Sequence, residues 1–303
     1  MAHLPDPVFS DEETARRSLR GIALLLVALV VFTCQDVITT HLARNYPVPF
    51  FLMIRYWVFA VAASIVAARA DGGFAQAVRS RSPKLQIFRA LLLIAEMGMF
   101  ALALRYLKLV ELHALFAATP LIVTALSVPF LGEQVGWRRW LAVLVGFAGV
   151  LIILRPGIGV FQPAAILGVA IALMYAVYTV MTKHVSRGDT FATTYWYTAF
   201  FGAIALSAIG PFFWVSPASI DWLWIATLCV SGLTGHYCFI KALEYAPASV
   251  LQPLTYLQLV GVTVLGYFFF AEVPDVPTVL GALIIVASGL YIIWREQVRK
   301  GAQ

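Results

Sequence analysis

Residues 19–41 read LRGIALLLVALVVFTCQDVITTH, an apolar stretch in which Asp36 is the first charged residue after Arg20. A helix needs about 20 mainly apolar residues to cross the hydrocarbon core of a bilayer. This stretch has that length, and it lacks the small-residue cleavage pattern that ends a secretory signal. We therefore predict that it is the first membrane-spanning helix of the mature protein.

The composition of the whole chain favours a membrane protein. Of the 303 residues, 61% are hydrophobic and 12% are charged, and the mean hydropathy is +0.88. Soluble domains carry about 25% charged residues, and a soluble core cannot absorb so many apolar side chains. A soluble globular protein is excluded, and the lipid bilayer is the expected partner of most of the surface.

Outward from the first helix, apolar windows of similar length recur along the chain. The windows cover residues 19–41, 48–68, 85–104, 112–131, 137–154, 164–182, 191–214, 220–240, 248–270 and 276–294. They lack the alternation of polar and apolar residues that marks strands, and they are longer than the roughly ten-residue strands of an outer-membrane barrel. The expected fold class is an all-α membrane protein with ten transmembrane helices.

Basic residues are distributed unevenly between the two sides of this topology. With a cytoplasmic amino terminus, 16 of the 21 lysines and arginines lie on the cytoplasmic side, four lie outside, and Arg55 lies inside a span. Cytoplasmic loops carry the excess of positive charge in membrane proteins. We therefore expect both termini in the cytoplasm, as an arm of residues 1–18 and a tail of residues 296–303. The net charge of +6 follows from this topology, so no nucleic-acid partner is expected.

The two halves of the chain are similar to each other. At a shift of 139 positions, ALRY at 103–106 matches ALEY at 242–245, and LGE at 131–133 matches FAE at 270–272. Each half holds five spans, and because five is odd the second half must enter the membrane from the opposite side. We predict two inverted five-helix repeats, residues 19–157 and 158–295. Repeats of this kind are typical of transporters that expose a central site to each side in turn.

These motifs resemble the drug/metabolite transporter superfamily, in its ten-helix EamA-type branch of bacterial exporters. The resemblance covers nearly the whole chain and includes Arg55, the Thr119-Pro120 pair and the glycines at 146 and 149, while Pro253 and Pro274 depart from a strict repeat. It implies a bacterial inner-membrane protein in which spans 1, 3, 4, 6, 8 and 9 surround a central cavity. Its aromatic-rich spans look most like those of aromatic amino-acid exporters.

Asp36, Arg55 and Glu96 are ionisable residues inside predicted spans. Inserting a charged side chain into the hydrocarbon layer costs roughly 2.5 kcal/mol or more. We therefore expect each of them to have a partner, contact with water or a function. Asp36 and Arg55 lie in the outer half of the membrane, with Glu96 near the midplane, so the three could meet. Arg55 is either neutralised by Asp36 or Glu96 in a structural ion pair or part of a site. Glu96 could attract a substrate ammonium group or carry a coupled proton.

Further residues are candidates for lining the cavity. Mid-span aromatic rings suit stacking against a substrate, while hydroxyls, amides and imidazoles could orient its polar head. The alternative for each is ordinary core packing. The candidates are Glu96, Phe100, Tyr175, Tyr178, His236, Tyr237, Gln252 and Tyr256. Pro120 and Pro253 interrupt their spans, and each is either a hinge or a static kink; His113 is assigned to packing ahead of function.

The expected function is secondary active or facilitative transport that exports small amphipathic metabolites, above all aromatic and other neutral amino acids, by alternating access. The nucleotide-binding motif GxxxxGK[ST] is missing, so a substrate or ion gradient must drive transport. No cofactor or metal is expected, because the three cysteines lack metal-site spacing. Two alternatives stay open: an organophosphate or nucleotide-sugar carrier of the same superfamily, and an intramembrane enzyme.

Overall fold

The computed structural model describes residues 11–132, 136–154 and 163–300, and every regular element in these ranges is a helix. In chain order the helices are α1 (Asp11–Asn45), α2 (Val48–Ala68), α3 (Gly73–Ala77), α4 (Pro83–Ala103), α5 (Leu109–Phe116), α6 (Thr119–Leu131), α7 (Trp137–Leu154), α8 (Pro163–Val185), α9 (Phe191–Ile209), η1 (Gly210–Phe213), α10 (Asp221–Tyr245), α11 (Ala248–Leu251), η2 (Gln252–Thr255), α12 (Tyr256–Phe270) and α13 (Val276–Lys300). The predicted all-α class is confirmed.

Within the described ranges, seven helical segments are long and apolar enough to cross a membrane. They are Arg16–Asn45, Val48–Ala68, Pro83–Ala103, Leu109–Leu131, Ile166–Val185, Phe191–Phe213 and Asp221–Tyr245. Three shorter apolar helices are Trp140–Ile153, Tyr256–Phe270 and Val276–Ser288. The chain is therefore a multi-pass membrane protein, and the count of ten spanning helices stays a prediction.

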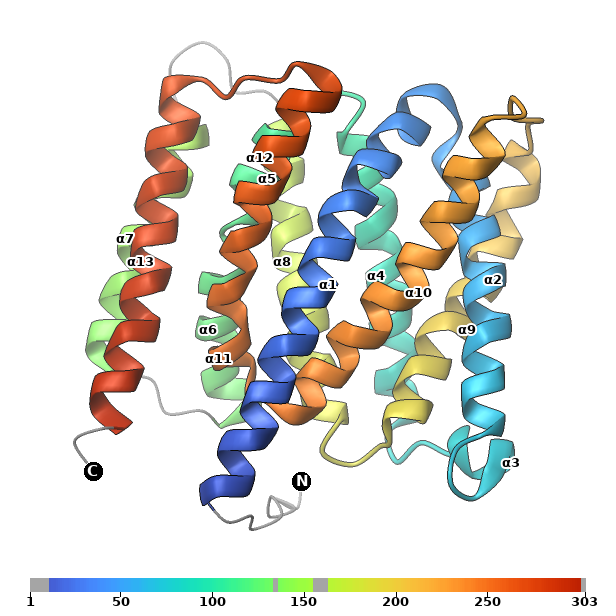
Figure 1. Cartoon of the computed structure of the whole chain (residues 1–303), viewed down its shortest axis with the longest axis horizontal. Helices are drawn as coiled ribbons and strands as arrows, with labels where there is room; N and C mark the ends of the chain where they lie inside the picture. Colours follow the sequence, from blue (N-terminus) through green and yellow to red (C-terminus); the bar gives the residue numbers. More distant parts are fainter. Residues whose placement is uncertain (1–10, 133–135, 155–162, 301–303) are drawn as a thin grey trace.

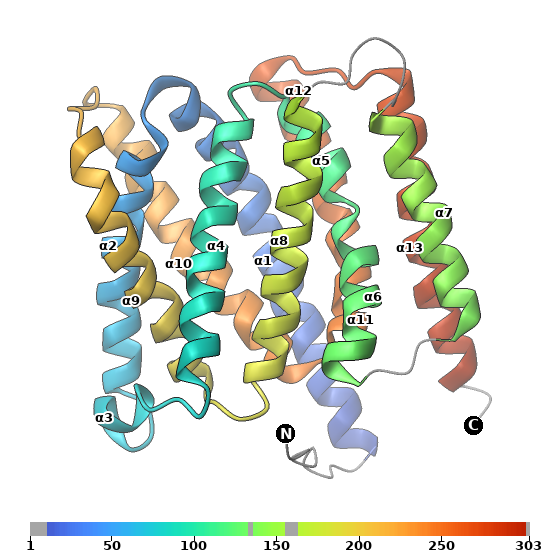
Figure 2. The ribbon, with the colours of Figure 1, turned by 180° about the vertical axis from the view of Figure 1, so that it is seen from behind.

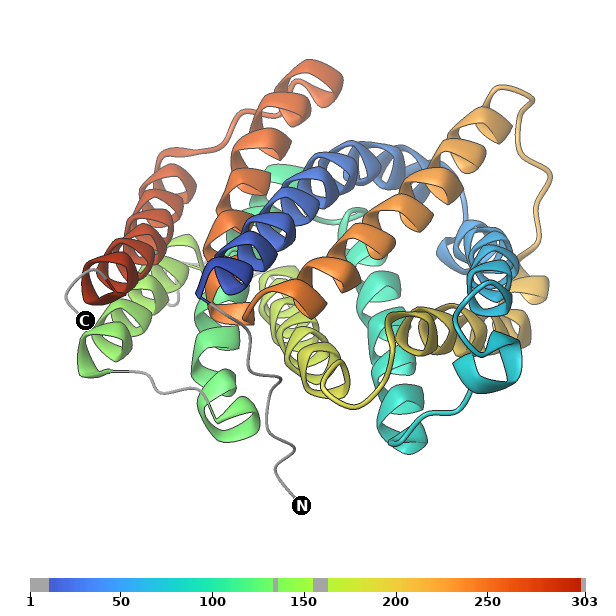
Figure 3. The same cartoon turned by 60° about the horizontal axis from the view of Figure 1, so that its bottom comes forward.

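The helices pack in reciprocal pairs between the two halves of the chain. Helix α1 packs against α10 and α12, just as α8 packs against α4 and α6. Helices α7 and α13 form a pair at one end of the bundle, and α2 and α9 form a pair at the other (Figures 1 and 2). Figure 3 shows α1, α4, α8 and α10 between these two pairs. The four central helices are thus placed to surround a site drawn from both halves.

Both hinge candidates lie where a helix is interrupted. Helix α5 ends at Phe116 and α6 begins at Thr119, so Pro120 is the second residue of the new helix. Pro253 lies in η2, which separates α11 from α12. Proline has no backbone N–H and cannot continue the hydrogen-bond ladder of a helix. Motion at these two interruptions stays a prediction.

The ends of α6 and α12 adopt the same unusual backbone conformation. Gly132 follows α6 with φ of 70°, and Ala271 follows α12 with φ of 52°, the one positive φ of a non-glycine residue in the described chain. A left-handed conformation costs an L-residue roughly 1–2 kcal/mol, whereas glycine adopts it freely.

We therefore expect Ala271→Gly to stabilise the fold by about 1 kcal/mol and Gly132→Ala to destabilise it by a similar amount. A Cβ on Gly132 would meet nothing within 4 Å, so a clash would not contribute. The measurement is the thermal unfolding midpoint of each purified variant in one detergent. A lower midpoint for Ala271→Gly than for the parent would contradict this account of the helix ends.

Candidate functional site

A pocket lies among the central helices, and we call it the central pocket. Its lining side chains come from α1, α2, α4, α5, α8, α10 and α12. They are Phe32, Gln35, Asp36, Thr39, Leu52, Arg55, Leu93, Glu96, Met97, Phe100, His113, Phe116, Tyr175, His236 and Gln258. Most of these helices belong to the spans that the family resemblance placed around a cavity. Helix α2 is an addition, because it contributes Leu52 and Arg55.

Asp36 is held by residues from two other helices. Its Oδ2 atom lies 3.0 Å from Nε2 of His113 on α5, and Nε2 of Gln258 on α12 donates a hydrogen bond of 2.9 Å to the same oxygen. Helix α1 brings Asp36 to this position, where it is buried. Asp36 therefore joins α1, α5 and α12 at one wall of the central pocket.

Glu96 is a buried carboxylate that has no bonded partner. Its exposed fraction is 4%, it lines the central pocket, and it makes no hydrogen bond or ion pair within the described part of the chain. Burying a charge without a partner is costly. A proton, or a cationic group that enters the pocket, would offset that cost.

Arg55 does not form the ion pair that was considered from the sequence. Its exposed fraction is 2%, and Nη2 donates a hydrogen bond of 3.2 Å to Oε1 of Gln35. The Nε atom has no partner, and neither Asp36 nor Glu96 pairs with the guanidinium in the part of the chain that is described. The physical reason is that Asp36 faces His113 and Gln258 instead.

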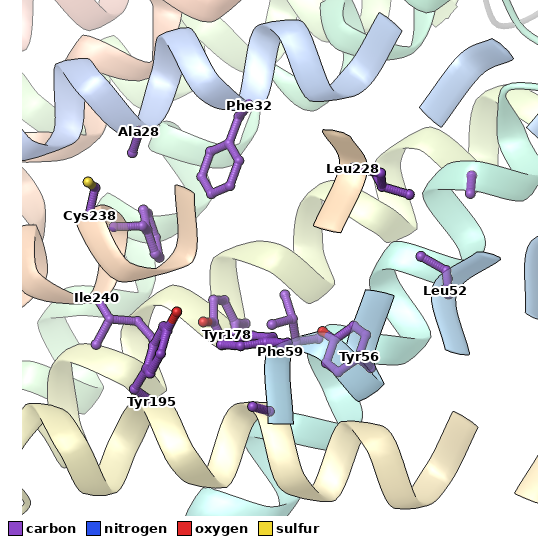
Figure 4. Close-up of a cluster of buried hydrophobic side chains, with 14 of the residues drawn as sticks. Ala28, Phe32, Leu52, Tyr56, Phe59, Tyr178, Tyr195, Leu228, Cys238 and Ile240 are labelled. Carbon is purple, nitrogen blue, oxygen red and sulfur yellow. The ribbon is translucent and has the colours of Figure 1, made fainter. Parts of the chain in front are cut away.

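Aromatic rings form another part of the pocket wall. The His236 ring stacks on Phe59 at 5.7 Å between centroids and meets Phe32 edge-on at 5.5 Å. Figure 4 shows Phe32 projecting from α1 toward the interior of the bundle. Neither ring nitrogen of His236 has a hydrogen-bond partner among described residues, although the residue is buried.

Two further aromatic candidates, Phe100 and Tyr175, also line the pocket. The ring centroids of Phe100 and His113 are 5.4 Å apart, and those of Tyr175 and Phe116 are 5.1 Å apart. Together with His236 and Phe32, these rings surround a space in which a flat organic group could stack.

Three further candidates, all tyrosines, lie outside the lining of the central pocket. Tyr178 and Tyr256 are buried in the neighbouring core clusters and are not among the lining residues. Tyr237 is 42% exposed and contacts Phe191 and Tyr195, so it does not line the central pocket. It follows His236 directly, and one step along a helix turns the side chain by about 100°. The side chains of Gln252 and Pro253 lie outside the described residues.

Sequence reasoning missed several lining residues. His113 was assigned to packing, and Phe32, Phe116 and Gln258 were not singled out, although all four line the pocket. An amide at membrane depth is a usable signal, because polar side chains in lipid-spanning helices usually face the interior of the bundle. Gln258 carries that signal.

Both halves of the chain match the same family of known proteins. The EamA-like transporter family matches residues 19–155 and again residues 162–294. The S-adenosylmethionine uptake transporter of Rickettsia prowazekii is 27% identical over 285 residues, 92% of this chain and 94% of that protein. The riboflavin transporter of Vibrio cholerae is 28% identical over 283 residues, 90% of this chain and 93% of its own.

Two further proteins resemble the chain at lower coverage or lower identity. The pseudopaline exporter of Pseudomonas aeruginosa is 26% identical over 192 residues, 61% of this chain and 66% of that protein. A crystal structure shares the fold with a TM-score of 0.68 at 18% identity, covering 92% of this chain and 97% of its own. The protein is therefore a transporter and not an enzyme, and it belongs to the EamA-like transporter family of the drug/metabolite transporter superfamily.

Proposed function

We propose that this protein transports amino-acid-type zwitterions that carry an aromatic or heteroaromatic group, with the central pocket as the binding site. The observation that carries the proposal is that one aromatic-walled pocket holds a carboxylate, Glu96, and a guanidinium, Arg55, that are both buried and not paired with each other. A cargo with an ammonium and a carboxylate group would offset both buried charges at once.

The aromatic walls narrow the class of cargo. Rings of Phe100, Phe116 and Tyr175 offer faces and edges for stacking against a flat group. Aromatic amino acids have this combination of groups. S-adenosylmethionine, for which the Rickettsia relative is named, also combines an amino-acid group and a positive charge with a flat adenine ring. Riboflavin has a flat ring but no zwitterionic group, so we expect it to bind more weakly.

We propose that transport proceeds by alternating access between two inverted halves, with ten spans and both termini in the cytoplasm of a bacterium. Three observations support this arrangement: the reciprocal packing of α1 on α10 and of α8 on α4, the matching left-handed ends of α6 and α12, and the start of α1 at the same edge as the end of α13 (Figure 1). Inverted halves can exchange conformations around a fixed site.

A gradient of the cargo or of a coupled ion would set the direction of transport. Export is the direction that the sequence resemblance implies. The pseudopaline relative is named an exporter, whereas the S-adenosylmethionine relatives are named for uptake. We propose Glu96 as the group that would carry a coupled proton, since it lines the pocket without a bonded partner among the described residues.

An organophosphate carrier fits the pocket less well. Among the described lining residues Arg55 is the sole lysine or arginine, and two carboxylates, Asp36 and Glu96, lie in the same lining. Sites for phosphate usually carry several cations in clamp geometry. The pocket therefore favours a cargo without a phosphate group.

The test is transport by purified protein in proteoliposomes. Radiolabelled S-adenosylmethionine, L-phenylalanine, L-tryptophan and riboflavin are each loaded inside or outside, with and without a pH gradient. We expect saturable counterflow of at least one zwitterion in both directions and little movement of riboflavin. Transport of riboflavin alone, or of none of the four compounds, would overturn the proposed cargo class.

A further inference from the structure

Arg55 has more hydrogen-bonding capacity than its surroundings use. A guanidinium carries five N–H donors in a planar fork. In the described chain, Arg55 forms one hydrogen bond, from Nη2 to Gln35, while Nε has no partner. The side chain is nevertheless 98% buried, as its exposed fraction of 2% shows, and it lines the central pocket. A buried cation with unused donors is suited to an anionic ligand.

The position of Arg55 is fixed from two sides. Gln35 on α1 accepts the Nη2 hydrogen bond. On α10, Gly232 leaves the space for the guanidinium, because a Cβ at that residue would lie 2.5 Å from Nε and 3.0 Å from Nη2. The guanidinium thus packs against the backbone of α10. Helices α1 and α10 belong to different halves of the chain, so both halves determine where the fork lies.

Among the residues that the structure describes, no carboxylate pairs with the Arg55 guanidinium. Asp36 is engaged by His113 and Gln258, and Glu96 is not within ion-pair distance of Arg55 in the described structure. A carboxylate brought by a ligand is the group that matches the planar fork, because it accepts two parallel N–H bonds.

We propose that Arg55 binds the carboxylate of the cargo and that Glu96 binds its cationic group, with Gly232 as the positioning residue for Arg55. This assignment rests on the proposed function. It divides the central pocket into an acid-binding end and a cation-binding end, so a molecule that lacks its carboxylate loses one of two charged anchors.

The test compares ligands with and without a carboxylate. Binding to purified protein in detergent is measured for two matched pairs: L-phenylalanine with phenethylamine, and S-adenosylmethionine with its decarboxylated form. We expect the parent to prefer the acid of a pair. Arg55→Gln should weaken binding of that acid at least tenfold and change binding of the matching amine less than twofold.

Two further variants separate an anchoring role from a structural one. Arg55→Lys keeps the charge without the fork, so it should restore part of the preference for the acid. Gly232→Ala crowds Nε and should reduce that preference while every charge is retained. The matched control is Gly98→Ala on the pocket-lining helix α4, where a Cβ would meet nothing within 4 Å, and it should bind like the parent.

The outcomes separate the two proposals. If the parent binds no member of either pair, the proposed function and this assignment both fail. If the parent prefers the acid and Arg55→Gln keeps that preference, or loses acid and amine equally, the proposed function stands and the assignment of Arg55 is wrong.

Discussion

Replacing Arg89 by alanine is expected to destabilise the fold by about 3–5 kcal/mol. Arg89 is completely buried, and its guanidinium donates to the side chains of Gln86, Thr182 and Thr198 and to the carbonyl of Thr194, at 2.7–3.2 Å. These bonds join α4 to α8 and α9. Hydrogen bonds to charged groups contribute about 1.5–3 kcal/mol each, and truncation would also leave a cavity.

The measurement for Arg89 is the unfolding midpoint in detergent, which should fall by roughly 10 °C. Arg89→Met fills most of the space without the donors, so its midpoint shows how much of the loss comes from hydrogen bonding. The matched control is Arg79→Ala, because Arg79 is exposed in the segment before α4. Equal midpoints for Arg89→Ala and Arg79→Ala would refute the stabilising role of the Arg89 cluster.

Replacing Glu96 by glutamine is expected to reduce transport of zwitterionic cargo by about 10- to 100-fold. The change keeps the shape of the side chain and removes its negative charge. A charge-assisted hydrogen bond to a cargo cation contributes about 1.5–3 kcal/mol, and 1.4 kcal/mol corresponds to a factor of ten in affinity. Any stimulation of transport by a pH gradient should also disappear, since the amide cannot carry a proton.

Initial rates of radiolabelled counterflow in proteoliposomes measure the effect of Glu96→Gln. Glu244→Gln is the matched control, because Glu244 lies in the last turn of α10 and pairs with Lys241 at 2.8 Å, outside the central pocket. We expect the control to transport like the parent. Rates for Glu96→Gln that equal those of the parent, with and without the pH gradient, would assign Glu96 a structural role.

The sequence predicted the all-α class because apolar length is a local property. The predicted spans were more continuous than the helices in the structure. The window at residues 248–270 contains a four-residue helix, the η2 turn at Pro253 and the shorter helix α12. The interruption shortens the continuous apolar helix to Tyr256–Phe270, which falls below the length of a full span.

The partners of the charged residues were harder to predict. Depth in the membrane suggested that Asp36, Arg55 and Glu96 could meet, and all three line the central pocket, but depth does not say which side chains face each other. Asp36 pairs with His113 instead, 77 positions along the chain.

The partners of Arg89 were also hard to predict from the sequence. Arg89 lies near the cytoplasmic end of the predicted span 85–104, and its sequence position does not reveal that threonines of α8 and α9 enclose it. Contacts between residues this distant in the chain depend on helix packing, which no local pattern encodes.

The most direct test of the transport account is accessibility of the central pocket from each side of a membrane. Thr39 lines the pocket, so Thr39→Cys in a variant without Cys34, Cys229 and Cys238 places one thiol there. Sealed, oriented vesicles are treated with a membrane-impermeant methanethiosulfonate on one side or the other, with and without saturating S-adenosylmethionine or L-phenylalanine. We expect the thiol to react from both sides and at least one of these compounds to slow the reaction. Reaction from one side only, or a rate that neither compound changes, would contradict alternating access to this pocket.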